Sequence, residues 1–590
     1  MKSPVELLSS LLQGCKRLEP CVKGIDRDII TIKHRFEHEG HGFLTVTLPA
    51  LCDAFDKGLS TGKFTCPTGL KKVRGGEIPR LFSGILCEVF DLFTGTILSQ
   101  PNLGVVKSMR EICRCFKKLA LDSDRVEELD REAKSKFFSV EDLCKNGVQL
   151  DSRQINILKA VRSHVLTKLD IFLPSELLPK HGPGAVVESV TTNQKWSVVL
   201  DSLDRVSEYG FDRLAACLKR LGMPDRRRPP SSSAKLVTVP KDSTSRRTIT
   251  VEPCVNQFLQ QGLNTYLRDS IKKDPVLRRC LSLTDQTKNQ KLALEGSRTD
   301  RWATIDLSSA SDLLTSSLVR LVFEEQSSFS ELLFDVRSPE VLDNGVAKEL
   351  EKFAGMGNAT TFPVQSVVFA VVAICAILDC RHEWPTSRSV ARTARRIRVY
   401  GDDIIVPTEY AQAVVGWLSA SGLKVNLKKS FLKGPFKESC GVDAFSGVDV
   451  TPLYVRHLPS DLSKRTPELI KHYVDLSNHA WMRGLYEFSN LLRQYAEDAL
   501  GTPLPHVHSL SGAFGLHTRR EWVSVQRWSK THHRFELRAY VLQSVFRKDE
   551  IDGYEALTKF FVSTERTADR EPRWYDVIFP KESDPKHLVR

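Results

Sequence analysis

Two adjacent aspartates between β-forming segments constrain the fold of this sequence more than any other feature. They belong to Tyr400-Gly401-Asp402-Asp403, and the four residues on either side are mostly apolar, with β-branched residues prominent. This pattern predicts two short strands joined by a tight turn, with Gly401 supplying the permissive backbone. Adjacent carboxylates raise each other's pKa unless a cation lies between them. The segment therefore predicts a hairpin that binds a divalent metal ion.

Chance alone also produces such a motif. At average residue frequencies, Gly-Asp-Asp occurs in roughly one chain in seven of this length. A solvated hairpin turn explains the four residues equally well when they are taken alone. The other motifs of the chain must therefore decide between the two readings.

The net charge predicts a polyanionic partner. The chain of 590 residues carries a formal charge of +13, with a sequence pI of about 9.0. Nucleic acid is the commonest partner of such a protein, and a membrane surface is the alternative. The longest apolar run, residues 367–378, is too short to span a bilayer and fits a buried helix, and no lipidation motif is present. We expect no membrane association.

The composition is that of a globular protein. With 41% apolar and 27% charged residues, the chain is neither disordered nor fibrous. Its length predicts about three subdomains around a large core. Glu6 lies where a signal peptide would be apolar, so we expect a cytoplasmic protein. The fourteen cysteines include no Cys-x-x-Cys pair, which favours reduced thiols over zinc ligands or disulfides.

Residues 1–220 carry no motif with recognisable chemistry. Amphipathic helical stretches alternate there with Gly and Pro, most clearly over residues 126–138 and 155–173. Residues 226–233 then form a basic connector, rich in Pro and Ser, for which we expect no regular structure.

A basic hairpin is predicted next. Residues 235–242 and 246–249 alternate apolar and polar side chains, which is typical of strands, and basic residues lie at their junction. Such a hairpin presents Lys235, Lys241 and Arg247 to phosphates, with a solvated charged hairpin as the alternative. The following pattern predicts a helix over 256–273 and polar loop segments at 283–287 and 295–297.

A second acid lies at the end of a predicted buried strand, residues 302–306. A buried charge must be paired or bound to metal, so Asp306 is a candidate metal ligand. The small polar residues 307–312 let a substrate approach the backbone, and we expect them to begin a helix. As an alternative, Asp306 is the N-cap of that helix.

A glycine-rich polar loop over residues 355–363 leads into a helix predicted to extend to about residue 378. Such a loop, with Gly357 and Asn358 at its centre, exposes amide groups to a nucleotide or phosphate. The alternative is a simple connection between two elements.

Beyond the two aspartates the pattern predicts a helix over 409–421 that ends at Gly422, then a strand, Lys428 and Lys429, and a turn-rich β segment over 436–452. The last 130 or so residues are predicted to be largely helical. Between residues 519 and 538, cations alternate with Trp522, Trp528 and Phe535. This suits a nucleic-acid surface, or else a helix that packs its aromatic face inward.

The spacing of the acids predicts one shared site. Asp306 lies 96 residues before Asp402. A strand, a helical crossover and a hairpin can form one antiparallel sheet, which would bring three carboxylates together. Two divalent ions held there would serve phosphoryl transfer to a 3′ hydroxyl, and the basic hairpin would bind the triphosphate. Lys428 or Lys429 could protonate the departing pyrophosphate.

These pieces resemble motifs A to F of the right-hand viral RNA-dependent RNA polymerases. More narrowly, they resemble the replicase catalytic (β) subunits of the single-stranded RNA bacteriophages, the leviviruses. The resemblance covers residues 235–457. The segments that carry it are Val237-Thr238-Val239-Pro240-Lys241, Asp285-Gln286-Thr287 with Asn289-Gln290, residues 303–312, Met356-Gly357-Asn358, Tyr400-Gly401-Asp402-Asp403-Ile404-Ile405, and residues 434–441 and 447–452.

The resemblance implies roles for particular residues. Asp306, Asp402 and Asp403 would hold two Mg²⁺ ions, with Mn²⁺ as an alternative. Asp312 and Asn358, next to Gly357, would recognise the ribose 2′ hydroxyl, which distinguishes RNA from DNA precursors. The cations expected at the triphosphate are Lys235, Lys241 and Arg247, with Lys428 and Lys429 nearby.

The resemblance also implies an α+β fold of fingers, palm and thumb, with an antiparallel palm sheet flanked by helices. We expect a mostly helical fingers region over 1–234, fingers with the basic hairpin over 235–300, a palm over 301–457 and a thumb over 458–590. The implied substrates are ribonucleoside triphosphates and an RNA template. The implied partners are translation elongation factors Tu and Ts and a ribosomal protein, in the cytoplasm of a bacterial host.

The sequence departs from the family pattern at three positions. Pro363 and Gln365 stand where acids are expected, and Arg246 stands where an aspartate is expected, which puts details of the template path in doubt. Two other functions remain open. A reverse transcriptase also uses a Tyr-x-Asp-Asp hairpin, although it ordinarily has a bulky aromatic shortly after the first acid. A non-enzymatic RNA-binding protein would need only the basic surface.

Overall fold

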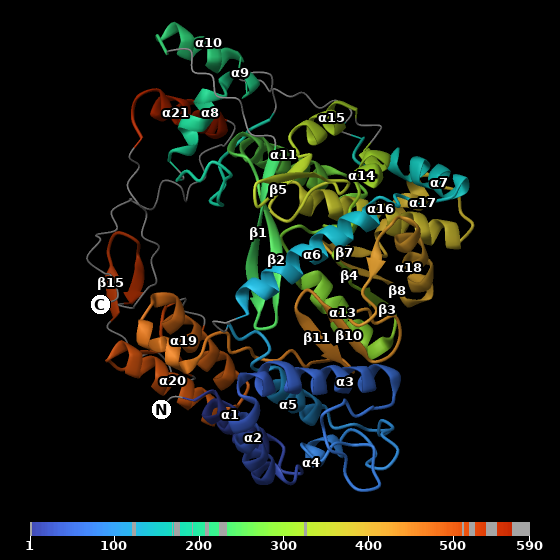
Figure 1. Cartoon of the computed structure of the whole chain (residues 1–590), viewed down its shortest axis with the longest axis vertical. Coiled ribbons are helices and arrows are strands. Elements are labelled where there is room, and N and C mark those ends of the chain that lie inside the picture. The colour runs from blue at the N-terminus through green and yellow to red at the C-terminus, as the bar shows by residue number, and fades with distance from the viewer. Residues whose placement is uncertain are drawn as a thin grey trace.

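The structure is a computed structural model in which helices surround several small sheets (Figure 1). It describes residues 3–120, 125–167, 169, 177–191, 193–206, 212–223, 233–323, 327–509, 513–518, 526–537 and 551–568. Residues 226–232 of the predicted connector and Trp522 lie outside the described residues, whereas the connector's last residue, Ser233, is the first residue of a strand. All thirteen cysteines whose side chains are described are free.

The central sheet has the predicted antiparallel arrangement. β3 (Trp302–Ile305), β8 (Asp403–Pro407) and β7 (Arg398–Tyr400) form it in the order β3-β8-β7, with Trp302 opposite Pro407 and Ile305 opposite Ile404. Strand and hairpin thus lie side by side although almost a hundred residues separate them. The α+β class and the strand–crossover–hairpin arrangement are confirmed.

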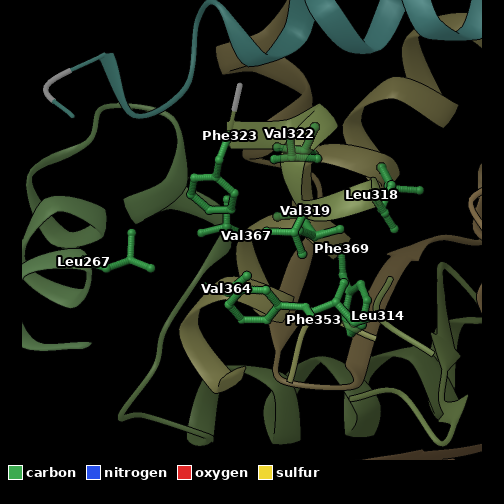
Figure 2. Close-up of a cluster of buried hydrophobic side chains, with 14 of the residues drawn as sticks. Leu267, Leu314, Leu318, Val319, Val322, Phe323, Phe353, Val364, Val367 and Phe369 are labelled. Atoms are coloured by element: carbon green, nitrogen blue, oxygen red, sulfur yellow. The ribbon is translucent and has the colours of Figure 1, made fainter. Parts of the chain in front are cut away.

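The crossover contains α16 (Thr361–Cys380), which packs against α7 (Ser152–Arg162), α14 (Ser316–Phe323), α17 (Ser387–Ala394) and α18 (Ala411–Ala420). Figure 2 shows Val364, Val367 and Phe369 of this helix among the buried side chains of α14 and Phe353. By length and composition alone α16 could cross a membrane, but 94% of its most apolar window is buried inside the protein. It is the centre of a core that collects buried residues from Val140 to Leu423, together with Val562, and is called here the α16 core.

The predicted basic hairpin consists of β1 (Ser233–Asp242) and β2 (Ser245–Val251), and it is confirmed. β5 (Glu340–Asp343) and β6 (Val346–Glu349) extend it into a sheet of order β2-β1-β5-β6. The helix expected after it is α11 (Cys254–Lys273). α6 (Val126–Cys144) packs against both hairpin strands, so a helix from the first quarter of the chain lies on the hairpin (Figure 1).

A second core joins the N-terminal helices to a segment late in the chain. Its buried residues come from 5–119 and from 431–516, and it is called here the two-segment core. In Figure 1 the N-terminal helices lie beside α19 (Pro467–Met482) and α20 (Tyr486–Leu500). The predicted boundary at residue 234 does not separate the two cores, because residues 5–119 belong to one and residues 140–206 to the other.

Two local predictions were wrong. The segment 295–297 is not a loop but part of α13 (Thr287–Thr299), because Asn289, Ala293 and Gly296 share one buried helical face. Gly296 packs so closely on Trp302 that an added Cβ would lie 2.9 Å from the Trp302 carbonyl oxygen. A small residue there reflects helix packing rather than a turn.

The residues after Asp306 do not begin a helix. Leu307 and Ser308 form β4 (Leu307–Ser308), which pairs with β9 (Lys424–Val425), and the next helix starts only at Ser316. The alternative of Asp306 as an N-cap is therefore wrong, because main-chain groups after it are used in strand pairing. The aromatic segment near Trp528 forms the strand pair β15 (Gln526–Ser529) and β16 (Arg534–Leu537), not a helix.

The remaining described elements are α1 (Pro4–Leu18), α2 (Ile25–Glu39), η1 (Phe43–Thr47), α3 (Leu48–Thr61), α4 (Ser83–Leu86), α5 (Leu103–Arg114), α8 (Lys195–Asp201), α9 (Leu203–Val206), α10 (Asp212–Arg220), α12 (Leu277–Cys280), α15 (Ser327–Asp335), η5 (Thr408–Tyr410), β10 (Phe436–Ser439), β11 (Val442–Phe445), β12 (Val448–Asp449), η6 (Pro459–Lys464), β13 (His506–His508), β14 (Leu516–Thr518) and α21 (Gly553–Ala568).

Candidate active site

One cavity of about 720 Å³ collects most of the predicted site residues. Its walls come from α6, the β1–β2 hairpin, the β3–β4 segment, the glycine-rich loop and the turn between β7 and β8. The predicted residues that line it are Lys241, Arg247, Asp306, Asp312, Gly357, Asn358, Asp402 and Lys429. Lys235, Asp403 and Lys428 are not among its lining residues.

Asp306 is held at the end of β3 by the segment that follows β9. Its Oδ2 accepts a hydrogen bond from Asn426 Nδ2 at 2.8 Å, and its main-chain N–H donates to Ser430 Oγ at 3.0 Å. Burial raises the pKa of the Asp306 carboxyl, and the charge of Asp402 raises it further, whereas Lys429 opposes the shift. Asp306 and Asp402 are therefore close enough to repel each other.

The turn that presents Asp402 depends on Gly401. This glycine has a φ of +61°, and a Cβ added there would lie 2.7 Å from the Phe362 ring. Its N–H also donates to Ser366 Oγ at 3.3 Å. A larger residue would be both strained and crowded. The tight turn leaves Asp402 exposed at the cavity.

Asp403 points to a different set of partners. Its carboxylate accepts hydrogen bonds from Ser439 Oγ at 3.3 Å and from the Cys440 N–H at 3.1 Å. Burial raises the pKa of the Asp403 carboxyl to about 7, with a further contribution from the charge of Asp402. The register that pairs Ile305 with Ile404 sets Asp306 and Asp403 at the next opposing positions. The two residues are thus neighbours on adjacent strands.

The carboxylates suit a divalent ion that also binds a substrate. Within the described residues, no three Asp, Glu, His or Cys side chains are grouped as ligands of one metal ion. Mg²⁺, however, usually takes one or two carboxylates and completes its shell with water and substrate phosphates. Asp306 and Asp402 provide two such oxygen ligands in one cavity, and a cation between them would relieve their repulsion. The role of Asp403 as a ligand stays a prediction.

Cations also line the cavity, among them Lys136, Lys241, Arg247 and Lys429. Burial lowers the pKa of Lys241, and the nearby charges of Arg247, Lys136 and Lys429 lower it further. Mutually repelling cations in one cavity favour the binding of an anion. Lys429 also lies 3.2 Å from Glu438, whose charge, followed by that of Asp306, raises the Lys429 pKa. Of the two candidate general acids, Lys428 and Lys429, only Lys429 lines the cavity.

The glycine-rich loop offers an unpaired hydrogen-bond donor. Asn358 Oδ1 accepts from the N–H and the hydroxyl of Thr360 at 2.8 and 2.7 Å, while its buried Nδ2 has no partner among the described residues. Gly357 has a φ of +138°, and an added Cβ would lie 1.8 Å from the Thr250 carbonyl oxygen. The loop thus packs directly on β2 and orients Asn358 beside the cavity.

Sequence reasoning missed the contribution of α6. Its Lys136 and Phe137 line the cavity, although the segment was predicted only as an amphipathic helix. Asp130 of the same helix forms an ion pair with Arg246, which accounts for the basic residue at that position. Amphipathicity predicted the helix, but no local signal indicates that it packs on a hairpin a hundred residues later.

A family model described as RNA replicase, beta-chain, matches residues 201–567. The chain belongs to this family. The chain is 42% identical over 236 residues to the RNA-directed RNA polymerase subunit beta of Escherichia virus Qbeta, a match that covers 39% of this chain and 36% of that protein. It is 36% identical over 219 residues to the RNA-directed RNA polymerase beta chain of Escherichia phage MS2, covering 37% of each. The matched segments thus span less than two fifths of these relatives.

Among solved structures, the chain is similar to the RNA-dependent RNA polymerase of a human picorbirnavirus. For an insertion-loop deletion mutant of that protein the TM-score is 0.39 at 13% identity, over 63% of this chain and 77% of the other. For the polymerase without that deletion the TM-score is 0.38 at 12% identity.

Proposed function

We propose that this chain is an RNA-directed RNA polymerase that transfers nucleotides from ribonucleoside triphosphates to the 3′ hydroxyl of an RNA, copying a viral RNA genome. The observation that carries the proposal is one cavity lined by Asp306 and Asp402 together with Lys241, Arg247 and Lys429. Membership of the replicase beta-chain family supports it. Carboxylates and cations around one cavity suit phosphoryl transfer, in which the protein mainly positions and stabilises charge.

Each group of residues has its own task. Lys241 and Arg247 bind the triphosphate, because their charges are already crowded and gain from an anion. Asn358 Nδ2 and the Asp312 carboxylate contact the sugar. Lys429 Nζ keeps its proton at neutral pH, since its pKa is raised, and delivers that proton to the departing pyrophosphate.

Asp306 and Asp402, with Asp403 as a third predicted ligand, would hold Mg²⁺ or Mn²⁺. When bound, two such ions supply an activated 3′ oxygen and neutralise charge on the leaving pyrophosphate. The chain's own part is to place the carboxylates, which the turn at Gly401 and the bond from Asn426 accomplish.

The test is nucleotide incorporation by the purified protein, given RNA, four ribonucleoside triphosphates and Mg²⁺. We expect Asp402→Ala to abolish synthesis while RNA binding, measured by filter retention, persists. Asp269→Ala is the matched control, because Asp269 pairs with Lys272 on the exposed face of α11. If Asp402→Ala incorporated nucleotides as fast as Asp269→Ala, the proposal would be contradicted.

The same assay separates the two other functions. A reverse transcriptase would prefer deoxynucleotides, whereas we expect a strong preference for ribonucleotides. A non-enzymatic RNA-binding protein would bind RNA without incorporating any nucleotide.

We further propose that residues 1–300 act as fingers, residues 301–457 as a palm and residues 458–590 as a thumb. The proposed location is the cytoplasm of a bacterial host.

Elongation factors Tu and Ts and a ribosomal protein are the proposed partners. Adding the three purified host proteins, singly and together, tests this. We expect synthesis to increase, and an unchanged rate with all three would contradict the partnership.

A further inference from the structure

Behind the cavity wall, Lys352 bridges two carboxylates. Its side chain is fully buried, and its Nζ lies 3.2 Å from Glu141 Oε2 and 3.3 Å from Asp312 Oδ1. The ammonium also lies 3.5 Å from the centre of the Phe137 ring. Asp312 and Phe137 line the cavity, and Lys352 does not. A buried cation therefore touches the cavity only through its neighbours.

The two carboxylates depend on Lys352 to different extents. Glu141 Oε1 also accepts hydrogen bonds from the main-chain N–H groups of Glu351 and Lys352. For Asp312, the ion pair with Lys352 is the one hydrogen bond or ion pair that its carboxylate makes within the described chain. Loss of the ammonium would leave Glu141 with partners and Asp312 with none.

The backbone holds the lysine in register with Asp312. Phe353 N–H donates to the Leu314 carbonyl at 2.7 Å, and Ser316 N–H donates to the Glu351 carbonyl at 2.9 Å. These bonds join the chain on both sides of Lys352 to the residues that follow Asp312. In addition, Cys144 Sγ at the end of α6 donates to the Asp312 carbonyl at 3.2 Å. The position of the ammonium relative to Asp312 is thus set from several directions.

We propose that Lys352 is a positioning residue that makes the cavity selective for a ribose, by holding the Asp312 carboxylate where it accepts a hydrogen bond from the 2′ hydroxyl of an incoming ribonucleotide. This inference rests on the proposed polymerase function. A carboxylate oxygen accepts a hydrogen bond from a hydroxyl group. A largely buried carboxylate without a cation is costly, so without Lys352 the Asp312 side chain turns toward water. This movement weakens the bond that distinguishes ribose from deoxyribose.

The experiment compares kcat/KM for a ribonucleotide and for the matching deoxynucleotide on one RNA template. We expect Lys352→Met to lower this ratio by about tenfold or more, mainly through a higher KM for the ribonucleotide. Lys352→Gln keeps an uncharged donor to Asp312, so this variant should lower the ratio less. It replaces Lys352→Met in the test if the methionine variant does not fold. The control is Lys348→Met, which removes the partly exposed lysine of β6 that lies 3.8 Å from Asp343.

A double variant tests whether Lys352 acts through Asp312. Asp312→Asn alone should lower the ratio, and adding Lys352→Met should lower it no further. A double variant whose fall equals the product of the two single falls would overturn the inference, as would an unchanged ratio in both Lys352→Met and Lys352→Gln. If the unaltered protein incorporates no ribonucleotide, the polymerase proposal itself fails. That result is distinct, because it appears before any variant is compared.

Discussion

The two cores of this protein are built in different ways. The α16 core comes mostly from residues 140–423 and surrounds a helix with few polar side chains, so its stability comes mainly from apolar burial. The two-segment core joins residues 5–119 to residues 431–516, and buried ions link its two segments, among them Arg110 between Asp56 and Asp443. Lys352 also pairs with Glu141 and Asp312 beside the α16 core. The contrast is that α16 itself is held mainly by packing, whereas paired charges join the distant segments of the second core.

Both cores reach the candidate active site, but through different elements. The α16 core carries α16 itself, which begins directly after the Asn358 loop. The two-segment core carries Phe436 of β10, whose last residue Ser439 and its neighbour Cys440 bond to Asp403. The position of Asp403 therefore depends on a core whose stability rests partly on paired charges. Perturbing each core separately should distinguish the two kinds of support.

The largest effect is expected from Arg110→Met. Arg110 Nε donates to the Val450 carbonyl at 3.0 Å, and its other nitrogens bind Asp56 and Asp443. Methionine leaves two buried carboxylates without this cation, so the free energy of unfolding should fall by about 3–5 kcal/mol. Urea unfolding measures the loss. Hydrogen exchange should show it first in residues 431–516.

The control for Arg110→Met is Lys272→Met. Lys272 pairs with Asp269 at 3.0 Å on an exposed helical surface, where such a pair contributes about 0.5 kcal/mol or less. If the two substitutions lower the free energy of unfolding equally, the buried ions of the two-segment core stabilise the protein no more than an exposed ion pair does. The contrast between the cores would then disappear.

A smaller effect is expected from Val367→Ala in α16. Val367 is fully buried among the apolar side chains of Figure 2, so the substitution removes two methyl groups and leaves a small cavity. The free energy of unfolding should fall by about 2 kcal/mol, and equally at pH 5 and pH 7, because the surroundings carry no ionisable group that the change exposes.

Val46→Ala is the matched control, since Val46 is 50% exposed. It should cost less than about 0.5 kcal/mol. Val367→Ala should also speed hydrogen exchange in residues 361–380 more than in residues 467–500. Equal acceleration in both segments would mean that the cores unfold as one unit, and the comparison would have to be given up.

The α16 core and the cavity acids could largely be predicted from the sequence. Their signals are local: an apolar run for α16, alternation for β1 and β2, and an acid at the end of a strand for Asp306. Pairing of β3 with β8 followed from one topological step, because a strand, a crossover helix and a hairpin form an antiparallel sheet in few ways.

The two-segment core and the roles of α6 and Lys352 could not be predicted. Arg110 and Asp443 lie 333 positions apart, and no pattern near either residue indicates the other. Lys352 is a single lysine in an ordinary polar segment, and only the folded chain places it between Glu141 and Asp312. Gly296 shows the same limit, since its small size serves packing against Trp302 rather than a turn.

The smallest effect, and the one that best separates the cores, is the loss of unfolding free energy in acid that His472 of α19 should cause. Its Nε2 accepts the Arg456 N–H at 3.2 Å, so the ring is neutral. Burial, followed by the charges of His457 and Arg456, lowers the pKa of His472 to about 4. In the unfolded chain the ring takes up a proton near pH 6.5, so the stability is full above that pH and falls as the pH drops toward 4. At pH 5 the loss should be roughly 1–2 kcal/mol.

Replacing the ring tests this assignment. His472→Gln keeps an acceptor for the Arg456 N–H and removes the titrating group. The free energy of unfolding should therefore fall less between pH 7 and pH 5 in this variant than in the unaltered protein, and the difference should equal the contribution of His472. His508→Gln is the control, because His508 is an exposed residue of β13. Hydrogen exchange at pH 5 should then show residues 467–500 protected in His472→Gln and opened in the unaltered protein, with residues 361–380 alike in both. Equal acid sensitivity of the two segments in the unaltered protein would assign the effect to groups outside the two-segment core.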